Sequence, residues 1–309
     1  MTAKNERLNT PFDYLFHMLE IGGKSSVTMN EVLAEAAKEK LPPAEADEER
    51  ILLLVIDQQN SFIEGGDLGV PGSVQDTARL GKFMYENLHK ITQVALTKDV
   101  HTPLQIFHPC WWVDRNGRHP VPVETVITVE SVMNGEWTPV FSPARSLAYL
   151  HELKSGGKRE LRIWPYHCLE GTNGVEFESQ FMNLVYFHTV SRRSTPVILE
   201  KGQDPLSEMY GAFYREDGVA SDANRAFLDS LLDYSKIYIA GQALSHCVLD
   251  TLKHILEHHA DNRAFTESIL LLKDCSSPIP GTEALTDAAM EEIVQRYGIQ
   301  LVTAEGLAI

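Results

Sequence analysis

The sequence predicts an α/β protein of three layers, in which a central six-stranded, mostly parallel sheet lies between two layers of helices. Two observations predict this fold class. Residues 51–56 are a continuous run of mostly branched apolar residues, too short for most helices and typical of a strand buried on both faces. After this run, short apolar segments alternate with segments of helical periodicity, a pattern typical of parallel sheets covered by helices.

Six segments of the chain fit strands and four fit helices. The expected strands are residues 51–56, 92–96, 196–200, 237–240, 269–273 and 300–303. The expected helices are residues 74–89, 222–234, 246–258 and 283–297. In the last helix the apolar residues Ala284, Ala288, Ile293 and Val294 lie near helical spacing, which predicts one face directed at the sheet.

Two segments do not fit this alternation. Residues 1–49 are expected to form a helical N-terminal extension, in which Asn30 caps a helix running from Glu31 to Lys40 and the Pro42-Pro43 pair prevents its continuation. The main domain then spans residues 50–309. Residues 110–160 are expected to be a long insertion in this domain, with a strand pair near residues 121–129, and to form a lid or an interface.

Composition excludes several classes of protein. The chain has 309 residues with 27 Lys and Arg against 43 Asp and Glu, a net charge of −16. This acidity argues against a nucleic-acid-binding protein and against a polybasic membrane-surface protein. There is no run of 18 apolar residues that could span a membrane, and the first residues do not resemble a secretory signal.

Cysteine usage indicates the compartment. Four cysteines in 309 residues do not make a disulfide scaffold, so a cytoplasmic, reducing location is expected. The thiols would then be buried, bound to metal or catalytic, and Cys110 and Cys275 are expected to be buried.

Three chemically active residue types follow predicted strands. Asp57 follows the first strand, Lys201 follows strand 196–200, and Cys247 lies in the turn after strand 237–240. The carboxyl ends of parallel strands share one edge of a sheet, so these side chains are expected to converge. A thiol at a helix start beside an ammonium group would have a lowered pKa. Asp57 could accept the thiol proton and later donate it to a leaving amine. Taken singly, each residue also fits a structural role: a turn aspartate, a solvated lysine or a buried thiol.

A second set of side chains suits a metal ion. Asp99 and His101 are separated by one residue after strand 92–96, and His167 supplies a second imidazole. One carboxylate and two imidazoles leave coordination positions open for water or substrate, which favours Zn²⁺, with iron or manganese as alternatives. Chance proximity is the competing interpretation. His254 and His258 lie one helical turn apart, but a solvated helix face explains them better.

The motifs occur in an order that resembles a known family. They are IDQQNSF at 56–62, KDVH at 98–101, WPYHC at 164–168 followed by GTNG, EKG at 200–202 followed by MYGAF, and AGQALSHCV at 240–248. Together they resemble the nicotinamidases of the isochorismatase-like cysteine hydrolase superfamily, over residues 51–305 apart from the insertion. The resemblance implies the isochorismatase-like hydrolase fold.

The resemblance also implies an amidase mechanism. Asp57, Lys201 and Cys247 would form a catalytic triad that hydrolyses nicotinamide to nicotinate and ammonia through a cysteine thioester. The oxyanion would be bound by the N–H groups of Ala243 and Cys247, with a cis peptide bond between Gln242 and Ala243. A homo-oligomer is also implied, as is a small-molecule amide as the binding partner.

By the same resemblance, Asp99, His101 and His167 hold one divalent transition metal ion that binds the pyridine nitrogen of the substrate. The aromatic residues expected to line the substrate pocket are Phe62, Trp164 and Tyr210.

The sequence departs from the family at several points. DVHT replaces the usual DWHP, an accessory histidine corresponds to Gln105 with His108 close by, and the segment between His101 and His167 is longer than usual. Amide hydrolysis is therefore better supported than nicotinamide as the substrate. Two alternatives stay open: hydrolysis of a different small amide, and a non-catalytic binding protein that retains the fold.

Overall fold

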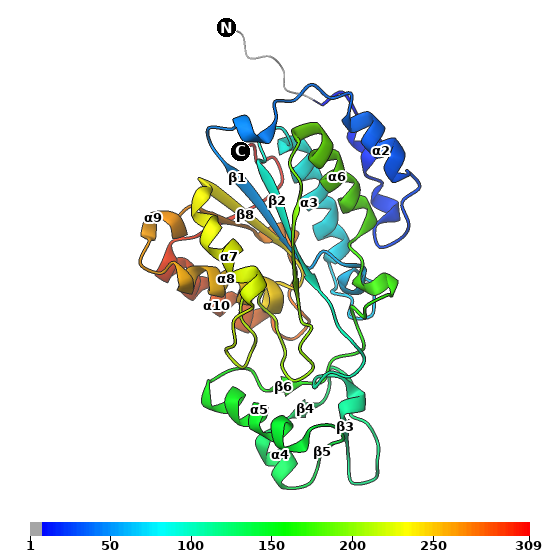
Figure 1. Cartoon of the computed structure of the whole chain (residues 1–309), viewed down its shortest axis with the longest axis vertical. Coiled ribbons are helices and arrows are strands. Elements are labelled where there is room, and N and C mark those ends of the chain that lie inside the picture. Colours follow the sequence, from blue (N-terminus) through cyan, green and yellow to red (C-terminus); the bar gives the residue numbers. More distant parts are fainter. Residues whose placement is uncertain (1–7) are drawn as a thin grey trace.

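The computed structural model describes residues 8–309 and has a six-stranded sheet at its centre (Figure 1). The strand order is β10-β9-β8-β1-β2-β7, and every neighbouring pair is parallel. All six predicted strands are confirmed, with small differences at their ends. They are β1 (Ile51–Ile56), β2 (Gln93–Asp99), β7 (Val197–Lys201), β8 (Lys236–Gly241), β9 (Ile269–Leu272) and β10 (Gln300–Val302).

Helices cover both faces of the sheet, which confirms the three-layer architecture. Helices α3 (Ser73–Asn87) and α6 (Ser179–Arg192) lie on one face, and α7 (Asp222–Ser230), α8 (Leu249–His258) and α10 (Glu283–Tyr297) lie on the other (Figure 1). Strand β1 shows why its sequence is continuously apolar. Leu53 and Val55 join the core under α3 and α6, whereas Leu52 and Leu54 join the core under α8 and α10.

The four predicted helices are present, but α6 was not predicted from the sequence. It lies between α3 and the N-terminal helix α2 (Met29–Ala36) and contacts both. Buried residues therefore occur around much of its circumference, from Phe181 and Met182 to Val185 and His188. A helix covered on two sides has no single apolar stripe, so the periodicity that reveals other helices is missing.

The N-terminal segment is helical, but the predicted cap is wrong. It contains α1 (Phe12–Leu15), α2 and two 3₁₀ turns, η1 (Met18–Glu20) and η2 (Ala44–Ala46). Thr28, not Asn30, caps α2: its hydroxyl accepts from the Glu31 N–H, and the Glu31 carboxylate accepts from the Thr28 N–H in return. The helix ends at Ala36 rather than Lys40. Residues 1–7 of the predicted extension lie outside the described residues.

Residues 109–162, here called the lobe, lie beyond the carboxyl ends of the sheet strands (Figure 1). The lobe has its own apolar cluster, which includes Trp112, Tyr149 and Leu161. The predicted strand pair within residues 121–129 is wrong, because β4 pairs with β6 and β3 pairs with β5, each antiparallel. The elements of the lobe are η4 (Pro109–Trp111), β3 (Trp112–Val113), β4 (Val126–Ile127), α4 (Val129–Met133), β5 (Thr138–Pro139), α5 (Pro143–Ser155) and β6 (Leu161–Arg162).

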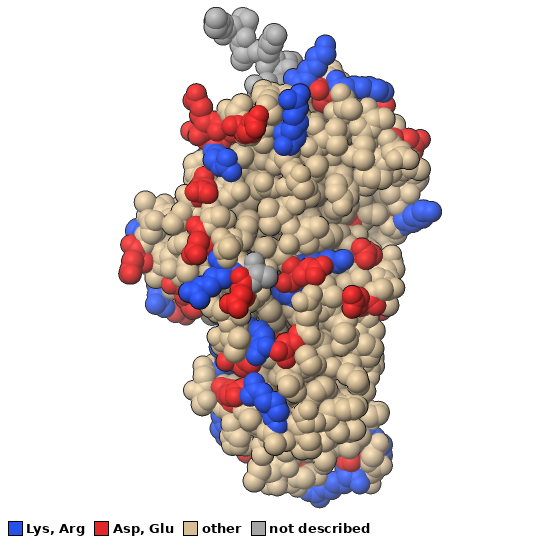
Figure 2. Space-filling model, in the orientation of Figure 1, with Lys and Arg blue, Asp and Glu red and all other residues tan. Residues whose placement is uncertain are grey.

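The four cysteines are all free. Cys168, Cys247 and Cys275 are buried, but Cys110, in the short turn η4, is only half-buried, contrary to expectation. In residues 8–309, no helix is long and apolar enough to cross a membrane. On the face shown in Figure 2, acidic and basic side chains are interspersed rather than gathered into a basic patch.

Candidate active site

Three side chains from separate strand ends meet in the interior. Asp57 directly follows β1, Lys201 is the last residue of β7, and Cys247 lies in a π-helical turn (Leu244–Val248) between β8 and α8. The Lys201 ammonium nitrogen is 2.9 Å from Asp57 Oδ2 and 3.7 Å from Cys247 Sγ. All three residues are buried. The structure therefore brings together the three residues that the sequence places at one sheet edge.

Asp57 is held by its neighbour on β2. The Thr97 hydroxyl donates to Asp57 Oδ1, and the Asp57 backbone N–H donates to the Thr97 oxygen at 3.0 Å. Burial raises the pKa of the Asp57 carboxyl, and the nearby Lys201 ammonium only partly opposes this effect. A raised pKa brings the carboxylate nearer to the range in which it can accept a proton and later return it.

Lys201 is the cation at the centre of the site. Its ammonium group also lies 3.1 Å from Asp99 Oδ1 and donates to the Met209 carbonyl at 3.2 Å. Burial alone would lower the pKa of Lys201, but the carboxylates of Asp57 and Asp99 outweigh burial and raise it well above the ordinary value. Lys201 is therefore a permanent positive charge between two carboxylates and the thiol.

The pKa of Cys247 differs from the sequence expectation. Burial raises it well above the usual thiol value, and the Lys201 ammonium does not compensate for burial and the two nearby carboxylates. The prediction of a lowered pKa is therefore wrong for the free site, because it counted the helix start and Lys201 but not desolvation. The thiol needs a base as it reacts, and one carboxylate oxygen of Asp57 lies within 4.8 Å of its sulfur.

Asp99, His101 and His167 form a compact, buried set of donor atoms. One side-chain donor atom from each lies within 4.8 Å of the others. His101 Nδ1 bonds the Gly202 carbonyl at 2.9 Å, and His167 Nδ1 bonds the Pro165 carbonyl at 2.7 Å. The bonds at Nδ1 leave Nε2 of each ring for a metal ion. His101 Nε2 lies 3.0 Å from Asp99 Oδ2, an ion-pair contact that a bound metal ion would replace. Burial also lowers the pKa of His167 to about 3, so the ring is neutral. The set fits a divalent metal ion.

A third imidazole lies beside this set. The ring of His108 is 6.1 Å from that of His101 and 6.0 Å from that of His167, between ring centroids. Its Nδ1 bonds the Pro103 carbonyl at 3.1 Å, while its Nε2 is buried without a hydrogen-bond partner. Gln105, which corresponds to the accessory histidine of the resembled family, donates its amide nitrogen to the Gly202 carbonyl at 2.6 Å, and its Oε1 is buried without a hydrogen-bond partner.

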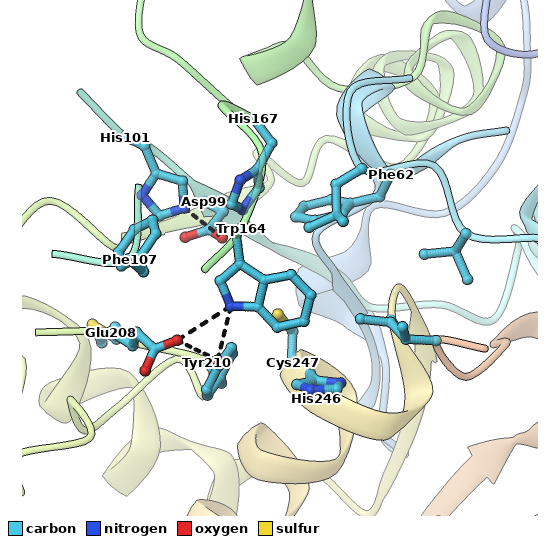
Figure 3. Close-up of a pocket in the computed structure, with 15 residues that line it drawn as sticks. Phe62, Asp99, His101, Phe107, Trp164, His167, Glu208, Tyr210, His246 and Cys247 are labelled. Carbon is cyan, nitrogen blue, oxygen red and sulfur yellow. Dashed lines mark hydrogen bonds and ion pairs between the residues drawn. The ribbon is translucent and has the colours of Figure 1, made fainter. Parts of the chain in front are cut away.

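One pocket is lined both by the metal-ligand candidates and by Cys247. Figure 3 shows the two groups on different sides of the pocket, with the Trp164 ring between them in that view. The three aromatic residues expected from the sequence, Phe62, Trp164 and Tyr210, all line it. Ala243 lines it as well, and the expected cis peptide bond between Gln242 and Ala243 is present.

Glu208 is a pocket residue that the sequence did not reveal. Its Oε1 accepts hydrogen bonds from the Trp164 indole N–H at 3.2 Å and from the Tyr210 hydroxyl (Figure 3). Its backbone N–H donates to the Tyr149 hydroxyl of the lobe at 3.0 Å. Burial raises the pKa of Glu208 to about 8. The feature of the sequence that could have indicated Glu208 is its position two residues before Tyr210, an expected pocket residue.

The histidine pair on α8 does not form a second metal site. His254 is buried and packs edge-on against the Tyr214 ring, with centroids 5.0 Å apart. His258 instead bonds Asp229 at 2.8 Å. The solvated helix face expected here is wrong for His254, because residues of the segment after β7 cover it.

Comparison with solved structures identifies the fold. The yeast nicotinamidase bound to the inhibitor nicotinaldehyde matches with a TM-score of 0.57 and 22% identity, over 82% of this chain and 99% of that chain. The Acinetobacter baumanii nicotinamidase and pyrazinamidase matches with a TM-score of 0.56 and 19% identity, over 84% and 98%. An L. infantum protein in complex with nicotinate matches with a TM-score of 0.52 and 18% identity, over 88% and 100%.

These matches show that the chain has the isochorismatase-like α/β fold, as the sequence motifs predicted. No protein-family model and no curated protein sequence matches the chain. At these identities the likeness is one of fold, so the chemistry has to be argued from the site.

Proposed function

We propose that the protein is an amidohydrolase that cleaves a small aromatic carboxamide, nicotinamide being the first candidate. One observation carries the proposal: the buried Asp57–Lys201–Cys247 group and the Asp99–His101–His167 set line the same pocket or directly adjoin it. A thiol, a base and a fixed cation suit acyl transfer, and the metal set that adjoins them through Asp99 suits binding of a ring nitrogen. The yeast and Acinetobacter baumanii proteins that share the fold are nicotinamidases by name.

In the first half of the proposed reaction, Cys247 Sγ attacks the carboxamide carbon and its proton passes to Asp57. The N–H groups of Ala243 and Cys247 stabilise the oxyanion of the tetrahedral intermediate. The carbon–nitrogen bond then breaks, Asp57 returns the proton to the departing nitrogen, and ammonia leaves behind a thioester. Lys201 balances the negative charge that moves between Asp57 and the sulfur.

In the second half, water attacks the thioester carbon while Asp57 accepts a proton. The carbon–sulfur bond breaks, the thiol of Cys247 is restored, and the carboxylic acid is released. Asp99, His101 and His167 would hold a divalent metal, which we propose to be zinc, and its Lewis acidity would bind the pyridine nitrogen. Phe62, Trp164 and Tyr210 would enclose the ring.

Ammonia release tests this proposal. The zinc-loaded protein should release ammonia from nicotinamide, and Cys247→Ala should abolish the release. Cys110→Ala is the matched control, because Cys110 lies outside the pocket and should be dispensable. A panel of other small amides, including pyrazinamide, measures specificity. Turnover of a different amide would reassign the substrate, whereas no turnover on any amide would favour the non-catalytic alternative.

We further propose that the protein acts in the cytoplasm as a homo-oligomer. Four free cysteines support a reducing compartment. The N-terminal extension, residues 1–49, is the candidate interface. Sedimentation of the full chain measures the assembly, and a monomer at micromolar concentration would contradict it.

A further inference from the structure

Arg159 of the lobe binds the turn that carries Cys247. Arg159 lies between α5 and β6, at the end of the lobe. Its Nη2 donates to the Ser245 carbonyl at 3.1 Å and to Asp250 Oδ1 at 3.2 Å, and its Nη1 donates to Asp250 Oδ2. The guanidinium group of Arg159 therefore makes a bidentate ion pair with Asp250 and a hydrogen bond to the backbone of Ser245.

The two partners of Arg159 lie on either side of the nucleophile. Ser245 precedes Cys247 by two residues in the π-helical turn, and Asp250 follows it by three in the first turn of α8. A π-helical turn is uncommon, and its hydrogen-bond pattern differs from that of the helix it joins. Because Arg159 binds one residue before Cys247 and one residue after it, Arg159 restrains the position of the sulfur between them.

Arg159 also contacts the pocket wall. The centre of its guanidinium lies 5.4 Å from the centroid of the Tyr210 ring, and Tyr210 lines the pocket. The guanidinium side chain is 35% exposed, whereas that of Asp250 is 11% exposed, so the pair is partly shielded from water. Only the planar fork of arginine can bind both Asp250 oxygens and the Ser245 carbonyl while facing an aromatic ring.

The other charged contacts of the lobe have different partners. Arg145 binds Asp217, and Lys158 lies 3.9 Å from Glu216, both in the loop that follows β7. Figure 2 shows acidic and basic side chains interspersed along the join between the lobe and the main body. Arg145 and Lys158 have no hydrogen bond or ion pair to the π-helical turn among the described residues. They anchor the lobe, but Arg159 connects it to the nucleophile.

We propose that Arg159 is a positioning residue for Cys247: the lobe uses it to hold the nucleophile-bearing turn and the Tyr210 wall in their reactive arrangement. This inference rests on the proposed function, because it takes Cys247 as the nucleophile. It gives the inserted segment a role in catalysis, where the sequence suggested only a lid or an interface.

Steady-state kinetics on the amide that the wild-type protein hydrolyses test the inference. Arg159→Ala should lower kcat about 10- to 100-fold, because a small displacement of a reacting group costs that much. KM should change less than about threefold. Arg159→Lys keeps the charge but loses the fork, so it should not restore kcat. Arg145→Ala, which removes a lobe anchor of similar kind, should stay within about twofold of wild type.

Hydrogen–deuterium exchange of the full-length protein supplies a readout that needs no turnover. Arg159→Ala should speed exchange in residues 244–250, whereas Arg145→Ala should not. Wild-type kcat in Arg159→Ala, unchanged exchange in that segment, or an equal loss in Arg145→Ala would each overturn the inference. If Arg159→Ala does not fold, the same two measurements are made on Arg159→Lys and Asp250→Asn. Each variant should then show the lower kcat and the faster exchange in residues 244–250. If the wild-type protein hydrolyses no amide, the proposed function fails, and exchange still decides whether Arg159 holds the turn.

Discussion

Lys201 Nζ lies 2.9 Å from Asp57 Oδ2, and both side chains are completely buried. Removing two charges from water is costly, and their mutual attraction offsets this cost only while both are present. Asp99 adds a second carboxylate 3.1 Å from the same ammonium group. Lys201 therefore neutralises the acidic interior of the site as well as contacting the thiol.

The first prediction concerns this buried cation. Lys201→Met leaves Asp57 and Asp99 without their counter-charge, so we expect the free energy of unfolding to fall by about 3–5 kcal/mol. Amide hydrolysis should be lost. Urea denaturation and ammonia release measure the two effects. Lys38→Met is the control: Lys38 is 68% exposed and pairs with Glu35, so its removal should cost less than about 1 kcal/mol. Equal losses in the two variants would contradict the role of burial.

The second prediction concerns metal binding. Purified protein reconstituted with zinc should retain about one ion per chain, and His167→Ala should retain almost none, because it leaves only Asp99 and His101 from the compact set. His258→Ala, whose ring bonds Asp229 elsewhere in the fold, should bind as the wild type does. Elemental analysis after gel filtration measures the content. Retention of the ion by His167→Ala would show that the site lies elsewhere.

Most of the fold could be predicted because local patterns specify it. The run at 51–56 is apolar on both sides since β1 is buried on both faces. The exceptions have physical causes. Helix α6 is enclosed by other helices and shows no amphipathic period, and the two-residue strands of the lobe pair across long sequence separations that no local turn announces.

The site was partly predictable for a different reason. Asp57, Lys201 and Cys247 follow strands that lie at one sheet edge, so topology brings them together. Glu208 and Arg159 were missed because their importance comes from tertiary partners, Trp164 for one and Asp250 for the other. The pKa of Cys247 was misjudged because the extent of burial cannot be read from sequence.

The third prediction concerns Gly202, which follows Lys201 in a left-handed conformation with φ of 79°. A Cβ atom there would lie 2.3 Å from Asp99 Oδ1 and 2.5 Å from His101 Cε1. Gly202→Ala should therefore displace both ligand candidates and reduce zinc content and activity by at least about tenfold. Gly218→Ala separates this collision from backbone strain, because Gly218 has φ of 83° and open space around it. The Gly218→Ala variant should lose only about 1–2 kcal/mol of the free energy of unfolding and should still bind zinc.

The fourth prediction uses the pKa of Glu208, which burial raises from the ordinary 4.5 to about 8. Between these values the folded protein holds a proton that the unfolded chain has lost. The contribution of Glu208 to stability is therefore complete below pH 4.5 and is lost as pH rises to about 8. Glu208→Gln keeps the shape but cannot ionise. The stability of wild type relative to this variant should fall by a few kcal/mol between pH 5 and 9.

Urea denaturation at several pH values checks the sign as well as the size of this effect. Burial also raises the pKa of Glu216, to about 7. The pH dependence of wild-type stability alone therefore cannot be assigned to Glu208. The difference between wild type and Glu208→Gln isolates the contribution of Glu208. Glu124→Gln, an exposed position on the lobe, should follow the wild-type curve. The opposite result is a difference in the free energy of unfolding, wild type minus Glu208→Gln, that stays constant or increases as pH rises. It would mean that Glu208 is ionised in the folded protein. Its hydrogen bonds from Trp164 and Tyr210 would then be charge-assisted.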